Sequence, residues 1–194
     1  MAGLTAQLAS RNANKLRELS RVLEGWELGL LGADGYPPEE GPTYYDNALA
    51  KALFGRTIAD SEAWVLGEDS GIEVDGLGGR PGAYSARFGA GEPVERLLDE
   101  LREVEGDGRR ARYVCELVCL TPDGEEFRGT GVLEGRIAEE PRGSEGFGYD
   151  PIFIPDGEVL TVAELGNEWK AENSHRARAA RALLHGLREA GSLL

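Results

Sequence analysis

Two adjacent acidic residues, Glu68 and Asp69, directly follow the short apolar run Ala63–Gly67. We expect that run to be a buried strand, and α/β proteins place ligands at the carboxyl ends of strands. Carboxylates there suit Mg²⁺, which takes oxygen ligands together with substrate phosphates. Ser70 and Gly71 would let a ligand approach the backbone closely. The alternative interpretation of the acidic pair is a turn between two strands.

Lysine is used at only a few positions, since the 21 basic residues are arginine except for Lys15, Lys51 and Lys170. A lysine ammonium is a compact point charge that suits phosphate, whereas the arginine guanidinium is a planar fork. Lys15 ends the segment SRNANK, which stands between a predicted strand and a predicted helix. The N-terminus of a helix favours phosphate. SRNANK lacks the Walker A pattern, so a plain strand-to-helix turn is the alternative.

Asn47 and Lys51 stand four residues apart in YYDNALAKAL, so a helix would place them on one face. An amide and an ammonium on the same face can clamp a phosphate. The alternative is a solvated helix face. Lys51 has largely apolar neighbours in the sequence, however, and burying a charge there is costly unless the ammonium has a partner.

A glycine-rich segment, GSEGFGYDP, carries two aromatic residues and an acid. Phe147 and Tyr149 could stack on a base, and Asp150 could accept a hydrogen bond from a base N–H. The alternative is a structural loop closed by an aromatic side chain.

Lys170, His175 and Arg176 gather in NEWKAENSHRARA, near a predicted helix start. A cation at a helix N-terminus opposes the helix dipole, which indicates that Arg176 faces a ligand. The alternative is an ordinary surface cap. His185, farther along the same helix, is expected to be structural or solvated.

The elements that must position these side chains form an alternation of short apolar runs and helical patterns, which predicts an α/β fold. The predicted strands are Leu4–Ala9, Ala63–Gly67, Arg112–Thr121, Glu125–Ile137 and Ile152–Ile154. The predicted helices are Lys15–Glu24, a segment from the cap Thr43 to Ala59, Val94–Val104 and Ser174–Ala190. Residues 76–91 are predicted to form an irregular loop.

Composition excludes several classes of protein. The chain has 194 residues, enough for one domain or for two lobes sharing one core. A net charge of −14 argues against a general nucleic-acid binder. No apolar stretch is long enough to cross a membrane and no signal peptide is evident, so we expect a cytoplasmic protein. Cys115 and Cys119 share one predicted strand and lie too far apart to bridge, so we expect buried, reduced thiols.

Five segments in this order resemble the inosine triphosphate pyrophosphatase family, the non-standard purine NTP pyrophosphatases. They are SRNANK, NALAKA, EDSGIEVDGLGGRPGAYSARF, GFGYDPIF and KAENSHRA. The resemblance covers the chain almost from end to end. It implies a mixed, twisted central sheet flanked by helices, in one domain over residues 1–194 with two lobes and an active-site cleft between them. It also implies a homodimer that hydrolyses ITP, dITP and XTP with Mg²⁺ to the monophosphate and pyrophosphate, cleansing the nucleotide pool.

The resemblance also implies roles for individual residues. Asp69 matches the family's proton acceptor and metal-associated acid, Glu68 is a second metal candidate, and Lys51 stands beside the phosphates. The substrate-binding positions are Ser10, Arg11, Asn12, Ala13, Asn14, Lys15, Ser70, Phe147, Gly148, Tyr149, Asp150, Lys170, His175 and Arg176.

Three positions depart from the family pattern. Arg11 stands where many members have glycine, and Glu68 replaces an aspartate while keeping the charge. Pro38 falls near the place of the family's upstream metal-associated glutamate, so Glu39 or Glu40 would have to take that part.

The expected reaction is attack of water on the α-phosphorus, a site of cleavage that the resemblance alone supplies. Lys15 and Lys51 would hold the leaving pyrophosphate, and Asp69 would orient or deprotonate the water. A 6-oxo purine would accept from His175 and Arg176, while Asp150 would accept from the ring N1–H and Phe147 would stack. The alternatives are a pyrophosphatase for modified pyrimidine nucleotides and a module that senses nucleotides without turnover.

Overall fold

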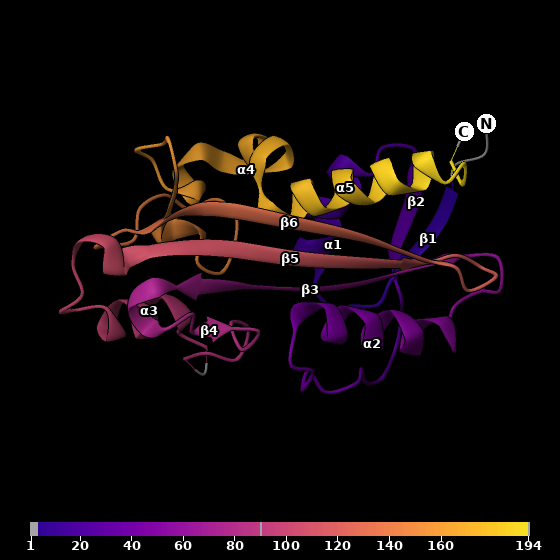
Figure 1. Ribbon diagram of the computed structural model, residues 1–194, viewed down its shortest axis with the longest axis horizontal. Helices are drawn as coiled ribbons and strands as arrows, with labels where there is room; N and C mark the ends of the chain where they lie inside the picture. Colours follow the sequence, from indigo (N-terminus) through magenta and orange to yellow (C-terminus); the bar gives the residue numbers. More distant parts are fainter. Residues whose placement is uncertain (1–3, 90, 194) are drawn as a thin grey trace. The chain divides into compact units, whose positions relative to one another are not determined.

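The computed structural model describes residues 4–89 and 91–193. Its strands form a seven-stranded mixed sheet that is flanked by helices (Figure 1). The strand order is β2-β1-β3-β5-β6-β7, and β4 pairs with β3. β1 runs parallel to β2 and β3, whereas β6 and β7 are antiparallel. The α/β fold that the sequence pattern predicts is therefore confirmed, as is the mixed, twisted sheet that the family resemblance implies. Within the described ranges, no helix has the length and apolar character that crossing a membrane requires.

The chain divides into two compact units. Unit 1 comprises Met1–Asp69, Cys115–Gly131 and Arg176–Leu194, and unit 2 comprises Ser70–Val114 and Val132–His175. Three strands contribute residues to both units, namely β3 (Trp64–Val74), β5 (Arg110–Leu120) and β6 (Glu126–Ile137).

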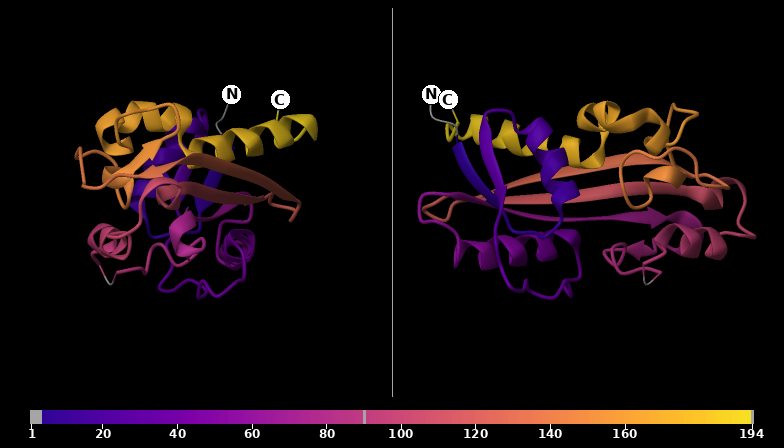
Figure 2. Two further views of the ribbon diagram at one scale, coloured as in Figure 1. Left: turned by 60° about the vertical axis from the view of Figure 1, so that its left-hand side comes forward. Right: turned by 180° about the vertical axis from the view of Figure 1, so that it is seen from behind.

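Unit 1 covers its part of the sheet with helices on both faces (Figures 1 and 2). Its other elements are β1 (Leu4–Leu8), α1 (Ala13–Val22), β2 (Trp26–Leu30), α2 (Tyr44–Arg56) and nearly all of α5 (His175–Glu189). Side chains of a strand alternate between faces, so neighbours on β5 meet different helices. Leu117 packs in one cluster with Leu19 of α1 and Leu183 of α5, and Val118 packs with Ala52 of α2.

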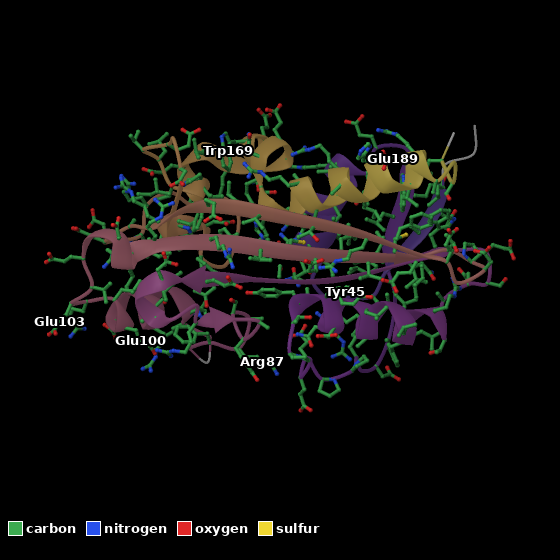
Figure 3. The ribbon with its side chains drawn as sticks, viewed as in Figure 1. Tyr45, Arg87, Glu100, Glu103, Trp169 and Glu189 are labelled. Carbon is green, nitrogen blue, oxygen red and sulfur yellow. The ribbon has the colours of Figure 1, made fainter. Side chains whose placement is uncertain are left out.

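Unit 2 has its own apolar core. Its other elements are η1 (Asp75–Leu77), β4 (Pro81–Gly82), α3 (Pro93–Glu100), η2 (Gly106–Arg109), η3 (Asp150–Ile152), β7 (Phe153–Pro155) and α4 (Val162–Asn173). Ile72 of β3, Leu97 of α3 and Phe153 of β7 are fully buried in this core. Trp169 of α4, labelled in Figure 3, packs against the same cluster.

The strand predicted to end at Gly67 continues to Val74, so the expectation that Glu68 and Asp69 follow its carboxyl end is wrong. Both acids lie inside β3. The strand continues because Ile72 and Val74 are fully buried in the core of unit 2. Ile72 also pairs with β4.

The helix starts differ from the prediction in an informative way. α1 begins at Ala13, two residues early, because Asn12 caps it. The predicted cap Thr43 is confirmed, with a complete capping box to Asp46. Helix α4 and the edge strand β2 were not predicted. The sequence pattern placed Lys170, His175 and Arg176 near one helix start. In the structure, Lys170 lies on α4, whereas His175 and Arg176 lie on α5.

Candidate functional site

Short polar side chains build the turn that enters α1. Asn12 Oδ1 accepts hydrogen bonds from the backbone N–H groups of Asn14 at 2.9 Å and Lys15 at 3.3 Å. Ser10 Oγ accepts from the backbone N–H of Asn12 at 3.1 Å. Such a capping arrangement satisfies amides that a helix start leaves open. It also fixes where the Lys15 side chain leaves the helix.

Arg11 of this turn bonds to the segment that follows β2. Its Nη2 donates to the backbone carbonyl of Ala33 at 3.2 Å and also to that of Asp34. The guanidinium thus ties the start of α1 to the segment after β2. A direct phosphate contact from Arg11 stays a prediction, as do those of Ala13 and Asn14.

Glu68 is one of the most buried charged groups of unit 1, at 1% exposure. Lys15 Nζ lies 2.5 Å from its Oε2. Arg176 donates to its Oε1 from Nε at 3.1 Å and from Nη2 at 2.9 Å. Burial alone would raise the pKa of Glu68, but these two cations outweigh it and hold the pKa well below its usual value. The lowered pKa favours the ionised form of Glu68.

Asp69, the next residue, faces a different pair of side chains. Lys51 Nζ lies 3.1 Å from Asp69 Oδ1, and Asn47 Nδ2 donates to Oδ2 at 2.9 Å. Lys51 also donates to the backbone carbonyl of Glu68 at 3.0 Å. The predicted common face of Asn47 and Lys51 on α2 is confirmed, and both side chains point to the same carboxylate.

Burial raises the pKa of Asp69 above its usual value, and the Lys51 ammonium and the Asn47 amide offset only part of that rise. Burial also lowers the pKa of Lys51, but Asp69 and Glu39 outweigh it, so the net shift is upward. Neighbouring carboxylates thus shift in opposite directions, with Glu68 kept charged and Asp69 made the better proton acceptor. Such a divergence is what acid–base chemistry requires of a pair.

The sequence left Glu39 and Glu40 as equal candidates for an upstream acid. Glu39 forms an ion pair with Lys51 Nζ, whereas the Glu40 side chain is exposed. Glu39 and Asp69 therefore converge on one cation. We name Lys15, Lys51, Glu39, Glu68 and Asp69 the lysine–carboxylate cluster.

This donor set fits a divalent cation only in part. Over residues 4–89 and 91–193, no group of three or more His, Cys, Asp or Glu side chains is arranged to hold a metal. Two carboxylates that already converge on an ammonium do suit Mg²⁺, which takes few protein ligands and completes its shell with water and phosphate oxygens. Asp69 and Glu39 are the residues that would hold it.

A second cluster lies in unit 2 around Asp150, which is 3% exposed. Its Oδ2 accepts from Lys170 Nζ at 2.6 Å and from the backbone N–H of Phe147 at 2.8 Å. Lys170 Nζ also lies 4.8 Å from the centre of the Phe147 ring, within cation–π range. Asp150 thus folds the glycine-rich loop back on itself and fixes Lys170 beside the aromatic ring.

Tyr113 of β5 joins this cluster, although the sequence gave no signal for it. Its hydroxyl donates to Asp150 Oδ1 at 3.3 Å. Its ring stacks on His175, with centroids 4.5 Å apart and planes at 8°. We name Tyr113, Phe147, Asp150, Lys170 and His175 the Asp150 cluster.

Tyr149 has a structural position in the loop. It is buried in the core of unit 2 and its hydroxyl donates to the backbone carbonyl of Ser85 at 3.0 Å. Phe147 is half-buried and Gly148 is exposed, so these two residues form the accessible part of the loop. Ser70, on β3, is also half-buried.

Gly146 gives a direct test of this loop. Its φ is +80°, and a Cβ there would collide with Asp150 Oδ2. Gly146→Ala is therefore expected to lower the free energy of unfolding by about 1–3 kcal/mol and to lower Tm. Gly148→Ala is the matched control, because Gly148 also has a positive φ of +62° but open space around its Cβ. Equal losses of Tm in the two variants would show that backbone conformation alone accounts for Gly146.

Arg176 pairs with Glu68, whereas its neighbour His175 stacks on Tyr113. Besides Glu68, its guanidinium pairs through Nη1 with Glu18 of α1. Adjacent residues that the sequence assigned to one base site thus have different sets of partners.

Known proteins resemble this chain over nearly its whole length. The Ham1 family matches residues 6–186. A dITP/XTP pyrophosphatase of Deinococcus radiodurans is 47% identical over 189 residues, covering 92% of each chain. One of Thermus thermophilus is 43% identical over 198 residues, covering 97% of this chain and 94% of that protein.

Solved structures of related proteins have a similar fold. The Staphylococcus aureus Ham1 protein has a TM-score of 0.81 at 32% identity, covering 96% of this chain and 99% of that chain. A nucleoside-triphosphatase, or dITP/XTP pyrophosphatase, of Mycobacterium abscessus has a TM-score of 0.72 at 42% identity, covering 93% and 99%. The resemblance seen in the sequence motifs is thereby confirmed, and the chain belongs to the Ham1 family.

Proposed function

We propose that this protein hydrolyses non-standard purine nucleoside triphosphates, namely ITP, dITP and XTP, to the monophosphate and pyrophosphate. The observation that carries the proposal is the lysine–carboxylate cluster, in which two lysines face three carboxylates. Relatives that cover nearly the whole chain are named dITP/XTP pyrophosphatases. The chemistry and the family thus support the same reaction.

Lys15 and Lys51 are assigned to the triphosphate, with the polar turn Ser10–Asn14 beside them. Asp69 is assigned as the acceptor of the proton that the attacking water loses, since burial raises its basicity. When Mg²⁺ is bound by Asp69 and Glu39, it supplies positive charge that offsets the charge of the phosphates. Lys51 keeps the Asp69 carboxylate oriented while the phosphates enter.

The Asp150 cluster is assigned to the base. Phe147 is proposed to stack on it, because stacking accepts any purine. Lys170 and His175 are proposed to donate to a 6-oxo group, which inosine and xanthine have and adenine lacks. Lys170 Nζ lies 4.8 Å from the centre of the Phe147 ring, whereas Arg176 pairs with Glu68 and Glu18. The predicted part of Arg176 in reading the base is therefore given to Lys170.

Coupled phosphate release tests the reaction itself. With ITP and Mg²⁺, orthophosphate is expected to appear only after inorganic pyrophosphatase is added, and EDTA is expected to abolish it. Orthophosphate without the coupling enzyme would mean cleavage at the γ-phosphate. Binding of ITP with no product would favour a nucleotide-sensing module, and turnover confined to modified pyrimidine nucleotides would favour the other alternative.

Replacing Lys170 by Ala tests base selection. The kcat/KM for ITP is expected to fall tenfold to several hundredfold, because the 6-oxo group loses a charged donor, while the value for ATP changes little. Arg176→Ala is the comparison variant, and it is expected to lower kcat/KM for ITP and for ATP by the same factor. Circular dichroism checks that both variants fold. A collapse of the ITP-to-ATP ratio in Arg176→Ala alone would return base reading to Arg176.

We also propose, from the family resemblance, that the protein is a homodimer and works in the cytoplasm. Light scattering on the purified protein measures the first of these, and a mass of one chain at micromolar concentration would contradict it.

A further inference from the structure

Glu18 belongs to none of the motifs that carry the proposed reaction. It lies on α1, three residues after Lys15, and so one helical turn farther along the same face. Its carboxylate pairs with Nη1 of Arg176, and its side chain is 14% exposed. An acid held against a buried guanidinium beside the phosphate-binding turn needs a physical explanation.

The contacts form a chain of four alternating charges, Glu18–Arg176–Glu68–Lys15. Arg176 gives Nη1 to Glu18 and gives Nε and Nη2 to Oε1 of Glu68. Glu68 then offers its other oxygen, Oε2, to Lys15 Nζ at 2.5 Å. Cys115 Sγ lies 3.4 Å from Glu68 Oε1, and burial raises the pKa of this thiol well above its usual value, so it stays protonated and donates.

The two oxygens of Glu68 are therefore engaged by two different cations, whereas Asp69 and Glu39 share the ammonium of Lys51. A buried carboxylate that faced Lys15 alone would hold the ammonium tightly, because opposite charges attract strongly at low dielectric. An arriving phosphate would then have to compete with the full charge of Glu68. Arg176 neutralises part of the negative charge of Glu68, and Glu18 holds Arg176 in the orientation in which it does so.

We propose that Glu18 is a positioning residue that acts through Arg176 and Glu68 to keep Lys15 available to a phosphate. The inference rests on the proposed function only in taking Lys15 as a phosphate ligand. It assigns Glu68 to the chain of charges Glu18–Arg176–Glu68–Lys15, which we name the relay. Metal binding is left to Asp69 and Glu39.

A double-mutant cycle with Glu18→Gln and Lys15→Met tests the relay. The readout is the Kd of inorganic pyrophosphate in the presence of Mg²⁺, measured by titration calorimetry, which needs no turnover. Glu18→Gln is expected to weaken binding about tenfold in the wild-type background and less than about twofold when Lys15 is already replaced. Glu18→Asp keeps the charge but has a shorter side chain, so its Kd for pyrophosphate is expected to lie between those of the wild type and Glu18→Gln.

Glu24→Gln is the matched control, since Glu24 is an exposed glutamate just beyond the same helix, and it should leave the Kd unchanged. Thermal unfolding of each variant separates loss of fold from loss of positioning. Equal fold-changes from Glu18→Gln in both backgrounds would overturn the relay, because the two residues would then act independently. Absence of pyrophosphate binding by the wild type would overturn it as well, since Lys15 would have no anion to receive.

The relay and the proposed function can be rejected independently of each other. Coupled loss of pyrophosphate binding in a protein that does not hydrolyse ITP would keep the relay and reject the activity. Hydrolysis of ITP with additive effects of the two substitutions would keep the activity and reject the relay.

Discussion

Asp69→Asn is expected to lower kcat/KM for ITP by at least roughly a hundredfold while the fold stays intact. The substitution preserves the shape of the side chain and removes both its charge and its basicity. Asp69 is 2% exposed and lies between Lys51 and Asn47, so the loss of the proton acceptor cannot be made up by another carboxylate in the same position. Steady-state kinetics with the coupled phosphate assay measures the effect.

Asp75→Asn is the control for Asp69→Asn. Asp75 is an exposed acid just after β3, and its replacement should leave kcat/KM unchanged. Near-normal turnover by a folded Asp69→Asn protein would remove Asp69 from the mechanism and return attention to Glu39.

Lys51→Met is expected to have two large effects. Removing one partner of a buried ion pair leaves the carboxylate of Asp69 without its counter-charge, which costs about 3–5 kcal/mol in the free energy of unfolding. Loss of the cation that is proposed to hold the phosphates should also lower kcat on the order of a hundredfold, and by the same factor for every triphosphate whatever its base. Urea unfolding and kinetics on ITP and ATP measure the two effects.

The double variant Lys51→Met with Asp69→Asn is an internal control. It removes both charges, so part of the lost stability should return. A kinetic loss confined to ITP would show that Lys51 reads the base. An unchanged unfolding midpoint in the single variant would show that Asp69 does not depend on the ammonium.

Local patterns predicted much of the architecture. The helices α1 and α5 and the cap at Thr43 follow from spacing within one element, and the structure confirms them. The length of β3 could not be predicted in this way. Its second half is a strand because residues distant in sequence, on β4 and in the core of unit 2, pair with and cover Ile72.

The site shows the same division. The sequence identified the residues that now meet in the lysine–carboxylate cluster, since Lys51 in an apolar helix required a charged partner. It could not choose between Glu39 and Glu40, because neighbouring loop residues have no periodicity to distinguish them. Tyr113 was missed because its aromatic ring on a predicted strand looks like any core residue.

Arg176 and His175 are adjacent in the sequence but have different partners in the structure. Consecutive residues of a helix project about 100° apart, so one can stack on Tyr113 while the other pairs with Glu68. A place for both residues at one base stays a prediction, and the contacts of Arg176 support the proposal that it helps to position Lys15.

Chromatographic analysis of the products from a panel of triphosphates tests the central claim most directly. The panel comprises ITP, dITP, XTP, ATP, GTP and a modified pyrimidine triphosphate, each with Mg²⁺ and wild-type protein. The account predicts monophosphate and pyrophosphate in equal amounts, with kcat/KM for ITP, dITP and XTP at least roughly tenfold above that for ATP. Diphosphate and orthophosphate as products, or an ATP value equal to that of ITP, would contradict it.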